Sequence, residues 1–186
     1  MIFALIALSG FITNYSVRAE ILEAQWEAHQ IRFHYSGFST HYTCDGIEHK
    51  VKRLLKLFGA RDDARIENTC LGHSRIQRFH RMRLAFSTPV PADKTDISRE
   101  IIPAEWQEVR IVGKLSRYLN SGDCELVEQF QRQVLSHLQV RNSKNRLHCI
   151  PYHHALNNLR LRMSVLKVLD KTELEERRDD SQIDTR

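Results

Sequence analysis

GDCELVEQF (residues 122–130) decides the fold, because a related stretch, CDGIE (44–48), stands eighty residues earlier in the chain. In both stretches an acidic residue follows the cysteine, and an apolar residue and then a glutamate stand three and four places after it. The same shift of eighty aligns EAQWEAHQI (23–31) with PAEWQEVRI (103–111). This self-similarity predicts an internal duplication.

The alignment continues after the loss of one residue between a helix and a strand. Cys70 then falls on Cys149, and RMRL (81–84) falls on RLRM (160–163). Both tryptophans and all four cysteines therefore have a counterpart. We predict an α+β fold of two β-α-β-β units, with a mainly antiparallel sheet and helices on one face.

Hydrophobic periodicity and capping signals place the individual elements. Apolar residues alternate with polar ones over 29–35, as in a half-buried strand, and an apolar stripe recurs at helical spacing over 45–58. Thr43 and Asp123 suit helix N-caps, and Gly59 suits the end of the first helix. The predicted strands are 29–35, 63–69, 81–88, 107–113, 143–148 and 159–167, and the predicted helices are 45–58 and 125–138.

The domain organisation follows from these elements and from the two ends of the chain. The stretch 89–103 holds three of the four prolines and reads as the connection between the units. The last residues carry seven acidic and four basic side chains and read as a charged, disordered tail. The predicted segments are a signal peptide (1–19), a first unit (20–91), a linker (92–103), a second unit (104–168) and the tail (169–186).

The N-terminal sequence MIFALIALSGFITNYSVRA favours export. An apolar run is followed by polar residues and by Val17-Arg18-Ala19, a cleavage site of the A-x-A kind, with cutting after Ala19. The run is short for a bilayer span, which takes about 20 apolar residues. An uncleaved anchor and a buried first strand are the alternatives, since no Lys or Arg precedes the run. We expect a periplasmic or secreted protein, and an integral membrane protein only if this segment stays uncleaved.

The four cysteines are expected to form two disulfides within the units. An even number of cysteines in an exported chain is typical of disulfides, and neither the paired spacing of a zinc site nor a C-x-x-C redox motif is present. A helix of 14 residues (~21 Å) and a returning strand of seven (~23 Å) bring the helix start beside the strand end. This geometry predicts Cys44–Cys70 and Cys124–Cys149, each stabilising by about 3.5 kcal/mol on the chain-entropy model.

Arginines on the strands are the clearest functional signal. The chain has a formal charge of +5, and the body between the signal peptide and the tail is more basic still. If the helices cover one face of the sheet, cations line the other and form a platform for phosphates, sulfates or carboxylates. The alternative is an ordinary solvated sheet face, which is the more common arrangement. The candidate anion-binding residues are Arg32, Arg81, Arg83, Arg110, Arg160 and Arg162.

Other functional classes find less support in the sequence. Nucleic acid is a poor match, because the cations are not interleaved with stacking aromatics and export removes the chain from it. The ten histidines show neither metal-ligand spacing nor repetition between the halves, so we expect no metal and no cofactor. A nucleophile elbow, a paired-carboxylate motif and a glycine-rich phosphate loop are all absent, and no catalytic residue is assigned.

The pair YTCDGIEHKV (42–51) and GDCELVEQF, with their Y-x-C-D-G and G-D-C-E-L-V-E-Q motifs, resembles a group of uncharacterised exported proteins from proteobacteria. The likeness covers most of residues 24–168. It implies export and oxidised cysteines, and it carries no catalytic residue with it.

The sequence therefore predicts a non-catalytic binding or structural role in the bacterial envelope, through a basic sheet face. The expected partner is an anionic envelope component or another envelope protein. Two alternatives remain: a hydrolase or transferase whose site gathers dispersed His, Arg and Glu residues, and a partner or inhibitor that offers a sheet edge for strand addition.

Overall fold

A computed structural model describes residues 20–70, 75–93, 100–112, 119, 121–153, 158–170, 172 and 175. The predicted signal peptide and most of the predicted tail lie outside these residues. Within them, no helix is both long enough and apolar enough to cross a membrane.

The described chain contains six strands and two α-helices, in two consecutive groups of strand, helix, strand, strand. In chain order they are β1 (Ile21–Ser36), α1 (Cys44–Leu57), β2 (Arg65–Asn68), β3 (Phe79–Pro91), β4 (Ile102–Val112), α2 (Cys124–Gln133), β5 (Val140–His148) and β6 (Asn158–Val168). Short 3-10 turns lie on either side of α2, at Ser121–Asp123 and Leu135–His137.

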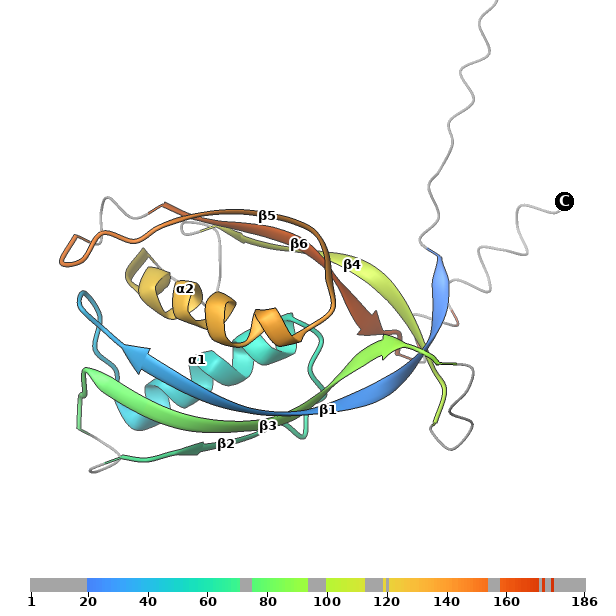
Figure 1. The fold of residues 1–186 in the computed structure, drawn as a ribbon, viewed down its shortest axis with the longest axis horizontal. Helices are drawn as coiled ribbons and strands as arrows, with labels where there is room; N and C mark the ends of the chain where they lie inside the picture. Colours follow the sequence, from blue (N-terminus) through green and yellow to red (C-terminus); the bar gives the residue numbers. More distant parts are fainter. Residues whose placement is uncertain are drawn as a thin grey trace, which may run out of the picture.

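All six strands form one antiparallel sheet in the order β2-β3-β1-β4-β6-β5, which confirms the α+β class. The sheet bends at its centre, so that β2-β3-β1 and β4-β6-β5 lie on opposite sides of the two helices (Figure 1). Both helices therefore cover the inner face of the sheet. The outer faces of the two strand groups point in opposite directions.

Helix α1 forms where the sequence predicts it. The Thr43 hydroxyl accepts a hydrogen bond from the Gly46 amide at 3.1 Å, as an N-cap does. Gly59 follows the helix with φ +88°, a conformation that residues other than glycine rarely adopt. A β-carbon there would come within 2.6 Å of the Leu166 carbonyl oxygen on β6, so glycine also allows the helix end to approach the other strand group.

Helix α2 is shorter than predicted, and its start is built differently. It ends at Gln133, after which the backbone tightens into a 3-10 turn that keeps both Val134 and Leu135 buried. Asp123 occupies the N-cap position but makes no capping hydrogen bond. Its carboxylate instead accepts hydrogen bonds from the Tyr42 hydroxyl at 2.5 Å and the Lys50 ammonium at 2.7 Å. Asp123 therefore does not cap the helix as predicted, and its side chain connects the second half to the first.

Five of the six strands are longer than their predicted counterparts, whereas β2 has four residues where the sequence predicts 63–69. β1 begins at Ile21, eight residues early, because its first part pairs with the end of β3 and the start of β4. Pro89 and Pro91 lie in β3 beyond the end of β2, where β3 is an edge and no outward amide is needed. Pro103 lies in β4, so the proline-rich stretch is only partly a connection.

One main core joins the two halves. Buried apolar side chains of β1, α1 and β3 form a single cluster with those of β4, α2 and β6. The aromatic ring of Phe130 on α2 stacks on Phe58 at 5.8 Å between centroids and meets Phe33 of β1 edge-on at 6.1 Å. The two halves therefore bury their apolar faces against each other.

The pairing of β1 with β4 is symmetric under the shift of eighty residues. Glu23 stands opposite Pro103, its own counterpart, and Leu22 opposite Ala104 mirrors Ala24 opposite Ile102. The outer strand pairs differ: Ile31 faces Leu84, whereas Ile111 faces Leu161. The sequence alignment of RMRL with RLRM places Leu84 on Met163, so the partner of Ile111 differs from the aligned position by two residues. An offset of two leaves every side chain on the same face.

Helix α2 closes the open edge of β1. Beyond its pairing with β4, β1 would expose backbone groups on that side. The Gln129 amide accepts from the Ser36 N–H and donates to the Ser36 carbonyl, both at 2.9 Å, and Gln133 does the same with His34 at 2.9 and 2.8 Å. Glu125 continues the row by accepting from the Phe38 and Ser39 amides.

Candidate anion-binding faces

The four cysteines form Cys44–Cys70 and Cys124–Cys149, as predicted, with Cα separations of 6.3 and 5.6 Å. Cys44 and Cys124 are the first residues of α1 and α2, and both are fully buried. Each disulfide ties the start of a helix to the chain just beyond a strand of the same half. The disulfides therefore fix β2 and β5, the two edge strands of the sheet, to the helices.

The structure divides the six predicted anion-binding residues between the two outer faces. Side-chain alternation places Arg32, Arg81 and Arg83 on the outer face of β2-β3-β1. It places Arg110, Arg160 and Arg162 on the outer face of β4-β6-β5. Because the helices and the core lie between these faces, the arginines are divided between two separate outer faces. We call them the β1 face and the β6 face.

The β6 face carries two rows of cations across neighbouring strands. Lys144, Arg162 and Arg110 stand side by side in one row, and Arg146 stands beside Arg160 in the next. Neighbouring strands lie about 4.8 Å apart, so the charged groups of a row are within reach of one phosphate chain. These side chains also line a depression of about 360 Å³.

Two cations of the β6 face, Lys144 and Arg146, were missed by the sequence analysis. Their spacing of two residues within the predicted strand 143–148 was the available signal. What the sequence could not show is the irregular pairing between Arg141 and Lys144, which sets the register against β6. That register places Lys144 beside Arg162 and Arg146 beside Arg160.

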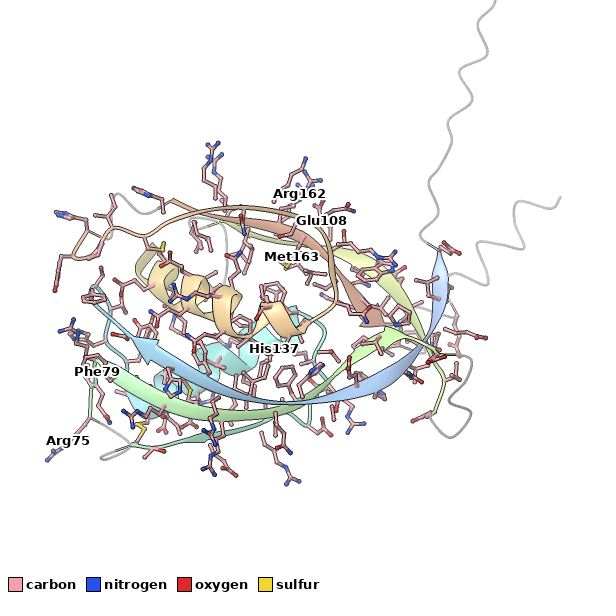
Figure 2. The ribbon with its side chains drawn as sticks, viewed as in Figure 1. Arg75, Phe79, Glu108, His137, Arg162 and Met163 are labelled. Atoms are coloured by element: carbon pink, nitrogen blue, oxygen red, sulfur yellow. A yellow bond between two sulfur atoms is a disulfide. The ribbon has the colours of Figure 1, made fainter. Side chains whose placement is uncertain are left out.

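Glu108 partly neutralises the β6 face. Its carboxylate forms ion pairs with Arg110 and Arg162, and Figure 2 shows Arg162 and Glu108 on the outer side of the sheet. Hydrogen bonds from these two arginines, that of Arg110 first, hold the pKa of Glu108 below its usual value. Arg146 and Arg160 are exposed and make no ion pair within the described part of the chain.

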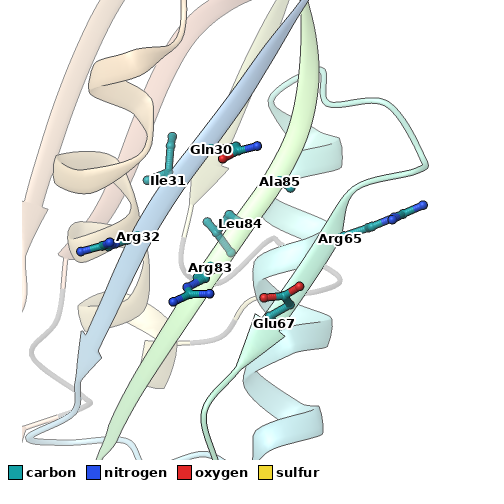
Figure 3. A pocket seen from close by; sticks show the side chains of 8 residues that line it. All are labelled: Gln30, Ile31, Arg32, Arg65, Glu67, Arg83, Leu84 and Ala85. Atoms are coloured by element: carbon teal, nitrogen blue, oxygen red, sulfur yellow. The ribbon is translucent and has the colours of Figure 1, made fainter.

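The β1 face has a similar arrangement with fewer opposed cations. Arg32 stands opposite Arg83, and Glu67 stands on the other side of Arg83. With Arg65 and Gln30 these residues surround a depression of about 480 Å³ (Figure 3). Arg81, the last of the predicted residues here, stands opposite His34 one step further along the strands.

Both faces place like charges directly opposite each other. The cross-strand pairs are Arg32 with Arg83, Arg110 with Arg162, Lys144 with Arg162, and Arg146 with Arg160. Directly opposed like charges destabilise a sheet. A bound anion converts this repulsion into attraction, because each guanidinium donates paired hydrogen bonds to phosphate or carboxylate oxygens.

The histidines do not gather into a catalytic or metal site among the described residues. His29 bonds Thr88 at 2.8 Å, whereas His41, His49 and His153 are exposed and His154 lies outside the described residues. One group of potential metal ligands brings Cys44, Cys70 and His80 within 4.8 Å of one another. Its two sulfurs are joined in a disulfide and are not thiolates, the form that binds metal.

No protein family, curated protein or solved structure matches this chain. A functional assignment therefore depends on the geometry and charge of its own surfaces.

Proposed function

We propose that this protein is an exported, disulfide-stabilised domain that binds phosphate-bearing polyanions of the bacterial envelope without chemical turnover. The observation that carries this proposal is the opposition of cations across neighbouring strands on both outer faces. Two disulfides support an oxidising compartment, either the periplasm or the exterior. The β6 face, with five cations and one carboxylate, is the primary surface.

The repeated design of the faces is explained by an internal duplication, which we propose as the origin of the chain. The symmetric pairing of β1 with β4 around Glu23 and Pro103 supports it. A second contact also repeats: Arg61 lies over Trp26 at 5.4 Å, and Arg141 lies over Trp106 at 4.0 Å. Arg141 and Trp106 each stand eighty residues after Arg61 and Trp26, their counterparts in the first half.

Binding to polyphosphate tests the proposal. Affinity is measured at increasing salt for the wild type, for Arg146→Gln/Arg160→Gln on the β6 face and for Arg32→Gln/Arg83→Gln on the β1 face. Glutamine keeps most of the side-chain length and removes the charge. We expect tight binding that weakens steeply with salt, and a loss of about tenfold or more in the β6-face variant.

A matched control separates the geometry of the faces from net charge. Lys52→Gln/Lys56→Gln also removes two cations, but these side chains project from α1 and not from an outer face. We expect this variant to retain nearly wild-type affinity. Equal losses in the control and in the face variants would reduce the effect to net charge and would refute the proposal.

The source of the phosphate is resolved by comparing soluble polyphosphate with vesicles of phosphatidylglycerol. Polyphosphate presents phosphates along a chain and the vesicles present them as a surface array, so both are bound if the faces recognise phosphate in general. Binding to neither, at low salt, is the result that removes the proposed function.

A further inference from the structure

One end of the molecule gathers exposed apolar side chains. Among the described residues, six large apolar side chains are exposed, and four belong to the loops at the end of β1, the start of β3 and the end of β5. They are Phe38, Ile76, Phe79 and Tyr152, which are 44, 70, 62 and 70% exposed. Figure 2 marks Phe79 at this end. We call these four residues, together with Arg78, the aromatic tip.

The three aromatic residues of the tip are connected through Arg78. The Arg78 guanidinium lies 4.6 Å from the ring centre of Phe38 and 5.2 Å from that of Phe79. Tyr152 meets Phe38 edge-on at 6.2 Å between centroids. The Nε atom of Arg78 is buried and has no hydrogen-bond partner among the described residues. The cation therefore contacts two aromatic rings.

Hydrogen bonds between the loops fix the tip. The Gly37 amide donates to the Arg78 carbonyl at 2.9 Å, and the Tyr152 amide donates to the Ser39 hydroxyl at 2.8 Å. Gly37 has no room for a side chain, since a β-carbon would come within 2.0 Å of the Thr40 carbonyl oxygen. The three loops are thus joined into one exposed surface before any partner binds.

We infer that the aromatic tip docks on a phospholipid membrane, with Arg78 at the phosphate level and the neighbouring side chains below it. Aromatic rings favour the boundary between headgroups and acyl chains, and arginine keeps its charge in the headgroup layer. Arg75, also exposed, adds a second cation at the same end and complements anionic headgroups. This inference rests on the proposed function and gives the phosphate partner a membrane source.

The orientation follows from the position of the tip. β1 ends and β3 begins at this end, whereas the start of β1 and of β4 lies at the other (Figure 1). The β1 and β6 faces flank the tip on either side, so both extend away from a membrane that the tip contacts. The tip supplies apolar insertion, and Arg78 and Arg75 at the same end supply charge attraction.

Flotation with vesicles of phosphatidylglycerol and phosphatidylcholine tests the inference. Ile76→Ser/Phe79→Ser removes two exposed apolar side chains that contribute little to the core. We expect it to lower membrane partitioning by about tenfold or more, and to leave polyphosphate binding unchanged. Ile101→Ser is the matched control, because Ile101 is 48% exposed at the start of β4, at the opposite end.

A second readout reports contact with the bilayer itself. In Phe79→Trp, the added tryptophan is expected to be quenched by lipids brominated in the acyl chain, above the signal of the two native tryptophans. Unchanged partitioning of Ile76→Ser/Phe79→Ser, or a lack of added quenching, overturns the inference. Self-association that the same variant abolishes, without vesicle binding by the wild type, overturns it in favour of a second copy.

The two proposals fail differently. If polyphosphate binds but vesicles do not, the aromatic tip is not a membrane site and the proposed function stands. If vesicles are bound through the tip at high salt but polyphosphate is not bound, the basic faces lose their assignment and the tip retains its own.

Discussion

Buried polar side chains connect the two halves at the residue scale. Asp123 from the second half is 1% exposed and binds Tyr42 and Lys50 from the first. Burial raises the pKa of the Tyr42 hydroxyl, and the Asp123 carboxylate raises it further, so the tyrosine remains a hydrogen-bond donor. The cysteine pairing was predictable from element lengths within each half. The partners of Asp123 were not, because they come from the other half.

We expect His80 to make the stability of the fold depend on pH. It is 1% exposed, and its Nε2 atom lies 3.2 Å from the Tyr42 carbonyl oxygen. Burial lowers its pKa below 6.5, and burial does the same for His29. Above about pH 6.5 both the folded and the unfolded chain hold these residues neutral. Below about pH 6.5 the unfolded chain binds protons that the folded chain excludes. The free energy of unfolding therefore decreases as the pH is lowered.

Urea unfolding at pH 7.5, 6.5 and 5.5 measures this effect. We expect stability to decline towards pH 5.5 in the wild type and to decline less in His80→Gln. The exposed His49→Gln is the control and should follow the wild type. An equal decline in His80→Gln and the wild type would show that His80 does not carry the dependence.

At the scale of elements, a helix replaces a strand along the edge of β1. Four helical residues advance about 6.0 Å and two strand residues about 6.6 Å. Gln129 and Gln133 can therefore bond Ser36 and His34, two residues apart on β1, without distortion. This closes the β1 edge to strand addition along these residues. The sequence predicted both elements but not this contact, because glutamine is ordinary on a helix surface.

Gln129→Ala is expected to destabilise the protein by about 1–3 kcal/mol, since the Ser36 amide and carbonyl lose their partners in a partly buried site. Gln131→Ala on the same helix is the control, and we expect a change within about 0.5 kcal/mol. Chemical denaturation of both variants measures the difference. Similar values for the two would mean that water replaces the Gln129 contact at no cost.

Elements with a complete local signal were predicted most accurately. α1 has a cap, an apolar stripe and a terminal glycine, and its bounds agree within a residue. α2 ends early because Val134 and Leu135 both enter the core through a tighter turn, which helical periodicity alone does not reveal. The extension of β1 by eight residues depends on β3 and β4, which are distant in sequence.

At the scale of the whole molecule, the bend of the sheet decides which arginines share a surface and can bind one ligand together. The alternation of each strand predicted which arginines face outward. It did not predict that the two groups of strands point in opposite directions, because that arrangement arises from packing both helices into one core. The arginines therefore lie on two opposite outer faces and not on the single platform expected from the sequence.

We propose that the opposed cations are retained for binding at the expense of stability. The most direct measurement is the free energy of unfolding with and without polyphosphate, for the wild type and for a variant with Arg32, Arg83, Arg146 and Arg160 changed to glutamine. We predict that the variant alone is at least as stable as the wild type. Polyphosphate at a hundred times its Kd should stabilise the wild type by about 2.7 kcal/mol and the variant far less. A variant that is less stable alone, or that polyphosphate stabilises as much as the wild type, would show that the opposed cations are not retained for binding.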